Sequence, residues 1–147
     1  MFRKDSAAGL RHHHAGVNEQ DALMTFDLAP VSSRRDIAML GIIHRASLGK
    51  EPSHFMKVLG IDKRRRVGEL LKDPRDEIKS PLIRRSILGL VAVYNKLPHV
   101  IKMESTVSKF QKALQTLLKR RCEAHCEDWQ DTFSPRTSLQ RHPLNTC

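Results

Sequence analysis

The chain has 147 residues, of which 39% are hydrophobic and 5% aromatic, and its net charge is +10 at neutral pH. This length suits one domain with a single hydrophobic core. No apolar run approaches the roughly 18 residues of a membrane-spanning helix, which excludes a helical membrane protein. The N-terminal residues lack the apolar core of a secretion signal, and three cysteines cannot all pair within one chain. We therefore expect an intracellular protein, nuclear or cytoplasmic, without a membrane partner.

Positive charge is concentrated in the middle of the chain. Residues 34–121 hold 21 Lys and Arg against 8 acidic residues. A field of this sign attracts polyanions such as nucleic acid or anionic lipid, although a solvated basic surface has the same composition. The densest run, Lys63–Arg66, also has the length of a nuclear localisation signal.

The first thirty residues predict a disordered segment followed by a short helix. Residues 1–17 are polar and aperiodic, so we expect them to be disordered, with His12–His14 an incidental cluster. Asn18 is placed to cap a short helix, and Pro30 ends that helix.

A longer helix is predicted from Ser33 to the glycine at position 49. Ser33 and Asp36 have the spacing of a capping box. The apolar stripe that follows recurs every three or four residues, at Ile37, Leu40, Ile43 or His44, and Ser47 or Leu48. His44 is expected to be a packed core histidine rather than a ligand. Gly49 supplies the left-handed residue that ends the helix.

Arg34 and Arg35 stand in the first turn of this helix. The helix dipole disfavours cations there. Another group is therefore expected to hold these two arginines, and it is either a nearby carboxylate or a phosphate.

The second half of the chain is also read as helical. Residues 53–60 predict a short helix, and residues 61–81 a charged connection with two prolines. The segment 84–98 has β-branched residues that would suit a buried strand, but the chain offers no partner strand, so we predict a helix over 86–97 that Pro98 ends.

The clearest predicted helix begins at a Ser105 cap and continues to Arg121. Its apolar stripe keeps the three-four spacing for four turns, at Val107, Phe110, Leu114, Leu117, Leu118 and Arg121. The opposite face carries Lys109, Lys112, Lys119 and Arg120. We expect an all-α fold, a small irregular bundle of four to five helices: a disordered segment 1–17, a basic helical domain 18–121, and a loop-rich Cys/His tail 122–147.

Two blocks of sequence carry a resemblance to a known family. They are LAPVSSRRDIAMLGIIHRASLGKEPSHF, residues 28–55, and RRSILGLVAVYNKLPHVIKMESTVSKFQKALQTLLKRR, residues 84–121. Together they resemble the C-terminal region, downstream of palm and thumb, of the reverse-transcriptase polyprotein of LINE-type, non-LTR retrotransposons. The first block is similar to a helix that leads to a short Leu-Gly turn. The matching residues of the second are Arg85, Ser86, Val91, Tyr94, Asn95, Leu97, Pro98, Ser105 or Ser108, Phe110 and Leu114.

The resemblance implies a protein without catalytic activity of its own. Polymerisation in that family rests on an Asp-Asp pair that binds two Mg²⁺ ions. This chain contains no Asp-Asp pair, and its one tyrosine, Tyr94, is followed by Asn95 and Lys96. The resemblance therefore implies a detached tail of a polymerase that handles nucleic acid, or a decayed remnant of one.

The C-terminal residues contain a candidate zinc set. Cys122, Cys126, His142 and Cys147 follow the pattern C-x3-C-x15-H-x4-C, and thiolates and imidazoles are suitable zinc ligands. His125 is an alternative ligand. The family's tails can carry a comparable knuckle with a shorter middle gap, and unliganded cysteines in a reducing compartment are the alternative. No other cofactor is expected.

The sequence thus predicts a non-catalytic protein that binds the phosphate backbone of RNA or DNA. Its candidate contact residues are Arg34, Arg35, Lys63, Arg64, Arg65, Arg66, Arg84, Arg85, Lys109, Lys112, Lys119, Arg120 and Arg121. Two alternatives remain open. One is a helical module that binds a protein partner along Leu114, Leu117 and Leu118, and the other is a remnant without function.

Overall fold

The computed structural model describes residues 18–51, 56–57, 59, 61, 70–72, 86–137 and 139–145. Within these ranges the chain forms five α-helices joined by turns, with no strand, which confirms the predicted all-α class. The segment 1–17 and the run Lys63–Arg66 lie outside the described residues. None of the described helices is long and apolar enough to cross a membrane.

The chain divides into two compact units, Met1–Pro30 and Val31–Cys147. The first unit contains helix α2, Glu19–Phe26. As predicted, Asn18 caps it, and the side-chain oxygen accepts a hydrogen bond from the Asp21 N–H at 2.8 Å. The helix ends at Phe26 because Asp27 adopts the left-handed conformation, with φ of 58°.

The second unit begins with α3, Val31–Ser47, and here the predicted capping box is wrong. The helix starts two residues before Ser33, so Ser33 lies inside its first turn. The Ser33 hydroxyl is buried and donates to the carbonyl oxygen of Gln130 at 3.3 Å. At the other end the chain turns at Gly49, whose φ of 76° is the left-handed conformation that the sequence predicted.

Three further helices complete the second unit. The predicted helix over 86–97 consists of a 3-10 turn, Ile87–Gly89, and α6, Leu90–Lys96. Pro98 stands before a short helix that the sequence did not predict, α7, His99–Lys102. The last is α8, Val107–Glu123; its cap is Thr106 rather than the predicted Ser105, because the Thr106 hydroxyl accepts from the Lys109 N–H at 3.2 Å.

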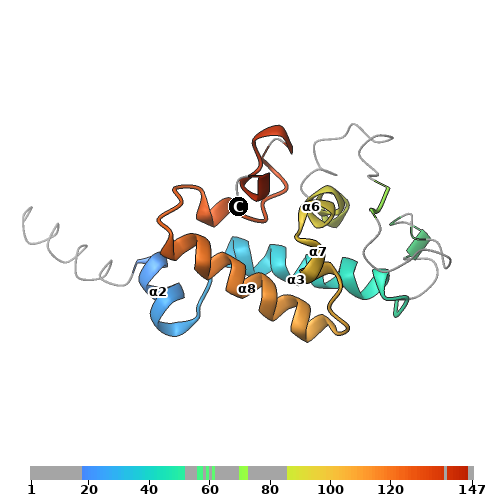
Figure 1. Ribbon diagram of the computed structural model, residues 1–147, viewed down its shortest axis with the longest axis horizontal. Coiled ribbons are helices and arrows are strands. Elements are labelled where there is room, and N and C mark those ends of the chain that lie inside the picture. Colours follow the sequence, from blue (N-terminus) through green and yellow to red (C-terminus); the bar gives the residue numbers. More distant parts are fainter. Residues whose placement is uncertain are drawn as a thin grey trace, which may run out of the picture. The chain divides into compact units, whose positions relative to one another are not determined.

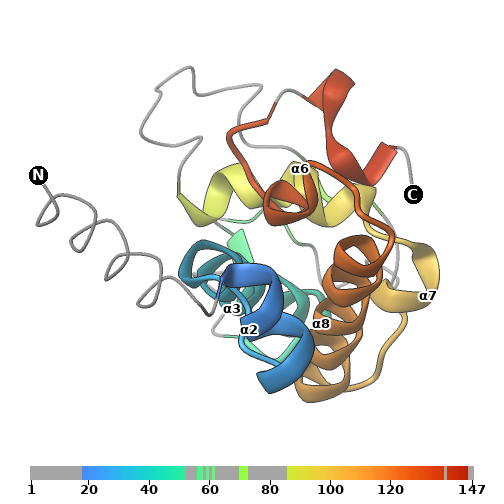
Figure 2. The same ribbon diagram turned by 90° about the vertical axis from the view of Figure 1, so that its left-hand side faces the viewer.

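Helices α3 and α8 lie side by side, and α6 runs across them (Figures 1 and 2). The faces that meet carry the predicted apolar stripes, whose fully buried members are Leu40, Ile43, Phe110, Leu114 and Leu118. A Cβ atom on Gly41 would meet the side-chain amide of Gln111 from α8, the end of a flexible side chain that can move aside. Burial of these side chains is the main driving force of the fold.

His44 is buried at the meeting point of these elements, as the sequence predicted for it. Its ring stacks on Phe110 of α8, with centroids 4.0 Å apart. Its Nδ1 lies 2.9 Å from the hydroxyl oxygen of Tyr94 in α6, and its Nε2 lies 2.8 Å from the carbonyl oxygen of Glu104. The Ser47 hydroxyl is 3.0 Å from the same Tyr94 oxygen.

The hydrogen bonds fix how the protons of this cluster are placed. A carbonyl oxygen only accepts, so Nε2 of His44 carries a hydrogen and donates it to Glu104. Burial lowers the pKa of His44, which keeps the ring neutral and leaves Nδ1 an acceptor. The Tyr94 hydroxyl therefore donates to Nδ1. Ser47 donates to the carbonyl oxygen of His44 at 2.7 Å.

Replacing Tyr94 with Phe tests this cluster. The ring keeps its packing, but Nδ1 of His44 loses its donor inside the core, and a buried polar group without a partner costs about 1 to 3 kcal/mol. We expect the free energy of unfolding in urea to fall by that amount at pH 7.5 while the helical circular dichroism is unchanged. Equal stability of the two proteins would show that the Tyr94 hydroxyl contributes nothing to the fold.

Candidate functional site

The exposed side of α8 carries unpaired positive charge. Lys109, Lys112 and Arg120 are all exposed, and we call these three residues the basic face of α8. They fall within about 80° of one another around the helix, because 3.6 residues make one turn. Within the part of the chain that the structure describes, none of the three forms an ion pair. The only acidic residue of α8 is Glu123, at its last position.

The other predicted contact residues are placed differently. Arg34 and Arg35 are exposed in the first turn of α3, and Nη2 of Arg35 lies 3.7 Å from Oδ1 of Asp36. The sequence left two possible partners for these arginines, a carboxylate or a phosphate. The partner of Arg35 is the carboxylate of Asp36. Lys119 is half-buried on the flank of α8. The remaining predicted contacts, Lys63, Arg64, Arg65, Arg66, Arg84 and Arg85, lie outside the described residues.

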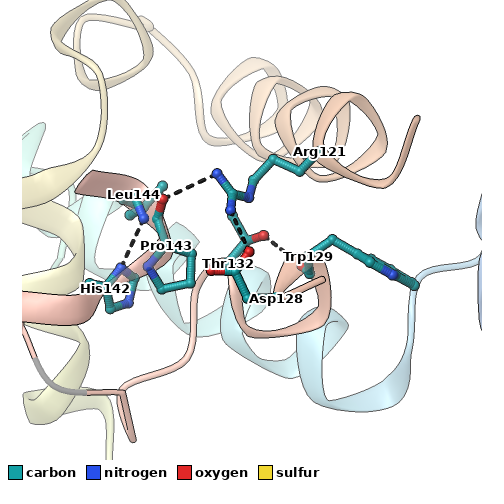
Figure 3. Close-up of polar contacts among 7 residues, drawn as sticks. All are labelled: Arg121, Asp128, Trp129, Thr132, His142, Pro143 and Leu144. Atoms are coloured by element: carbon teal, nitrogen blue, oxygen red, sulfur yellow. Dashed lines mark hydrogen bonds and ion pairs between the residues drawn. The ribbon is translucent and has the colours of Figure 1, made fainter. Parts of the chain in front are cut away.

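Arg121 does not belong to the basic face, although it follows Arg120 directly. Its side chain is 2% exposed and points from α8 toward the C-terminal segment (Figure 3). One guanidinium nitrogen donates to Oδ1 of Asp128 at 2.7 Å, and another donates to the carbonyl oxygen of Pro143 at 3.1 Å. Arg121 therefore fastens the C-terminal segment to α8 and is not available to a phosphate backbone.

The same segment contains the predicted zinc ligands, and the described residues do not gather them. Both ring nitrogens of His142 have backbone partners: Nε2 lies 3.0 Å from the carbonyl oxygen of Ser134, and Nδ1 accepts from the Leu144 N–H (Figure 3). Cys122 is buried, and burial raises the pKa of its thiol. No group of three metal-ligating side chains forms within the described ranges, and Cys147 lies outside them.

His142 is instead a packing residue of the C-terminal segment. It is 1% exposed, and burial lowers the pKa of its ring, which therefore stays neutral. Cys126 is half-buried with a free thiol, and His125, the alternative ligand, is exposed. The zinc set stays a prediction that these positions do not support.

A polar cavity lies between the first turn of α3 and the C-terminal segment. Its volume is about 230 Å³, and its charged lining residues are Arg35, Asp36, Asp131 and Arg136. Sequence reasoning missed this site. It took Asp36 for part of a helix cap, and Arg136 lies a hundred residues further along without any motif around it.

Asp36 is the unusual residue of this cavity. It is 4% exposed, and its Oδ1 accepts no hydrogen bond from the described part of the chain. Burial raises the pKa of its carboxyl group to about 6, and the negative charge of Asp131 adds to the rise. Arg35 and Arg136 act in the opposite direction and lower it. At neutral pH the fold thus contains a buried carboxylate whose ion-pair partner is Arg35.

Replacing Arg121 with Leu is expected to free the C-terminal segment. The change removes both hydrogen bonds that the guanidinium donates, so local opening of the segment becomes more frequent. Trypsin should then cleave after the exposed Arg136 and Arg141 several times faster, while α3 and α8 keep their helical signal.

The matched control is Arg120→Leu, the same chemical change one residue earlier on the exposed side. Its cleavage rates should equal those of the unchanged protein. Equal rates in the Arg121 and Arg120 variants would contradict the anchoring role of Arg121.

Replacing Asp36 with Asn is expected to stabilise the fold in a pH-dependent way. A folded-state pKa of about 6 against 3.8 in the unfolded chain means that ionisation destabilises the native state as pH rises between these values. Asn stays neutral throughout. The variant should be more stable by about 2 to 3 kcal/mol above pH 7 and equal to the unchanged protein near pH 4.

The comparison of the two proteins over pH 4 to 8 isolates this effect. Both proteins contain His44 and His142, whose contribution to stability is present above pH 6.5 and is lost on acidification. This contribution cancels when the free energies of unfolding of the two proteins are subtracted. Urea unfolding at each pH measures the difference. A difference that does not change with pH would show that Asp36 has an ordinary pKa.

Comparisons with models of protein families, with curated proteins and with solved structures find no match to this chain.

Proposed function

We propose that the protein binds the phosphate backbone of RNA or DNA without catalysing a reaction on it, and that the basic face of α8 is its contact surface. The observation that carries the proposal is the exposure of Lys109, Lys112 and Arg120 on one side of a helix, with no ion pair among the described residues. Unpaired cations release the counterions of a polyanion when they bind it, which is the main source of affinity for a backbone.

The dimensions of the face support this choice. Lys109 and Arg120 are eleven residues apart, which is about 16 Å along a helix. One strand of a duplex rises about 3.4 Å per nucleotide, so the face is about five nucleotides long. The resemblance of residues 28–55 and 84–121 to the tail of LINE-type reverse transcriptases agrees with a nucleic-acid partner, and the proposed role includes descent from such a tail.

The alternative of a protein-binding seam has less support. Leu114, Leu117 and Leu118 are buried, and α8 packs against α3. A partner helix would reach these leucines only by displacing part of the chain's own core. The basic face needs no such rearrangement.

A salt titration with a charge-neutral variant tests the proposal. We replace Lys109, Lys112 and Arg120 with Gln and measure fluorescence anisotropy with labelled RNA and DNA duplexes between 50 and 200 mM salt. Each backbone contact contributes about 0.9 to the slope of log affinity against log salt. The variant should therefore bind more weakly, and its slope should be shallower by about 2 to 3.

The matched control replaces each of the three residues with the other basic residue, which keeps the positive charge: Lys109→Arg, Lys112→Arg and Arg120→Lys. Its slope should equal that of the unchanged protein, because the number of cations is the same. Binding of the Gln variant with an unchanged slope would overturn the assignment to α8. Absence of binding by the unchanged protein at 50 mM salt would overturn the function and leave a solvated basic surface.

A further inference from the structure

The cavity beside the first turn of α3 has the size and composition of a site for a small polar molecule. Its volume of about 230 Å³ is more than ten times what one water needs, and it is below the usual range of drug-sized pockets. All of its lining residues are polar or charged. A molecule that fills it must therefore be compact and must offer hydrogen bonds on most sides.

Asp36 presents a carboxylate to such a molecule. Its side chain is 95% buried, and Oδ1 has no hydrogen-bond partner within the described ranges. Nη2 of Arg35 forms an ion pair with Oδ1 at 3.7 Å, which is longer than a hydrogen bond, and the Arg35 side chain is 52% exposed. Because Asp36 lines the cavity, a bound N–H group can donate to its carboxylate.

The charges around Asp36 restrict the ligand further. A simple anion would face the carboxylates of Asp36 and Asp131, and a simple cation would face the guanidinium groups of Arg35 and Arg136. The guanidinium of Arg136 has no ion pair in the part of the chain that the structure describes. A guanidinium can donate two parallel hydrogen bonds to one carboxylate. Two positive and two negative groups match a ligand that carries one charge of each sign.

We infer that this cavity binds a small zwitterion, a free α-amino acid, whose ammonium group donates to Asp36 and whose carboxylate accepts from Arg136. Ser134 and Thr137 also line the cavity and suit a short or polar side chain. This site is separate from the basic face of α8 and does not depend on the proposed nucleic-acid binding.

Binding should depend on the ionisation of Asp36. The groups that influence its charge are Arg35, Arg136 and Asp131, and its carboxyl group takes up a proton near pH 6. A protonated Asp36 no longer attracts an ammonium group. Affinity for the amino acid should therefore be constant between about pH 7 and 8, where its ammonium group is charged, and fall as pH drops through 6.

The experiment uses the full chain, with glycine, L-serine and L-glutamine as probes. Each probe is titrated up to about 10 mM at pH 7.5, and its binding is measured by NMR saturation transfer. Acetate and ethylammonium, which have one charge each, are the matched control ligands. We expect saturable binding of at least one amino acid and at least tenfold weaker binding of both single-charge ligands, because each loses one of the two charge pairs.

Two variants test the assignment of the residues. Asp36→Asn and Arg136→Gln should each weaken binding of the amino acid at least tenfold. Neither change is expected to prevent folding, since Asn removes a buried charge while keeping the shape of the side chain, and Arg136 is exposed. The variant in which Lys109, Lys112 and Arg120 are Gln should bind the amino acid normally, so this site and the proposed function can fail separately.

Three results would overturn the inference. They are the absence of saturable binding for every amino acid probe, equal binding of acetate or ethylammonium, and unchanged affinity in Asp36→Asn. Equal binding of acetate would indicate an anion site at Arg136, and equal binding of ethylammonium a cation site at Asp36.

Discussion

The imidazole of His44 is the contact on which the rest of the second unit depends. It belongs to α3, stacks on Phe110 of α8, and accepts from Tyr94 of α6. It also donates to the carbonyl of Glu104, just before α8 begins. One buried ring therefore joins three helices, and only one tautomer satisfies all of its partners. Apolar side chains supply most of the stabilisation, but they tolerate sliding and rotation that these directional bonds do not.

Once α8 is held in this orientation, the helical period sorts its charges. Arg120 and Arg121 differ by about 100° around the axis, so one lies on the exposed side and the other enters the core. Arg121 then binds Asp128 and the carbonyl of Pro143, which fixes the C-terminal segment against α8. That segment carries Asp131 and Arg136 to the first turn of α3. The cavity is thus a consequence of how α8 is rotated.

Sequence periodicity was sufficient for the buried faces of the two long helices, but not for the short helix α7 or for the cavity. The three-four spacing identified the buried faces of α3 and α8 and placed His44 in the core, because a helix face is a local property. Caps were harder. Ser33 has the residue type and spacing of a cap, but its hydroxyl donates to Gln130, almost a hundred residues away. The partners of Asp36 and Arg121 are set by the path of the C-terminal segment, which has no periodic signal.

The exposure of the predicted contact residues is likewise set by neighbours on the same helix in some cases and by residues far along the chain in others. Exposure of Lys109, Lys112 and Arg120 follows from their positions relative to Phe110 and Leu114 on one helix, so the sequence identified them. The guanidinium of Arg121 has the same charge and an adjacent position. Its burial depends on Asp128 and Pro143, which lie beyond the helix.

Asp36 and Arg121 are both buried charges, and each has one side-chain atom without a hydrogen bond within the described residues. Two other nitrogens of Arg121 donate to a carboxylate and to a backbone carbonyl, which replaces part of the lost hydration. Asp36 keeps an acceptor without a donor in the described part of the chain, beside a cavity large enough for a small molecule. Packing alone does not require a carboxylate there, since Asn has the same shape and no charge to bury. The proposed amino-acid ligand, which donates to Asp36, would account for both the residue and the space beside it.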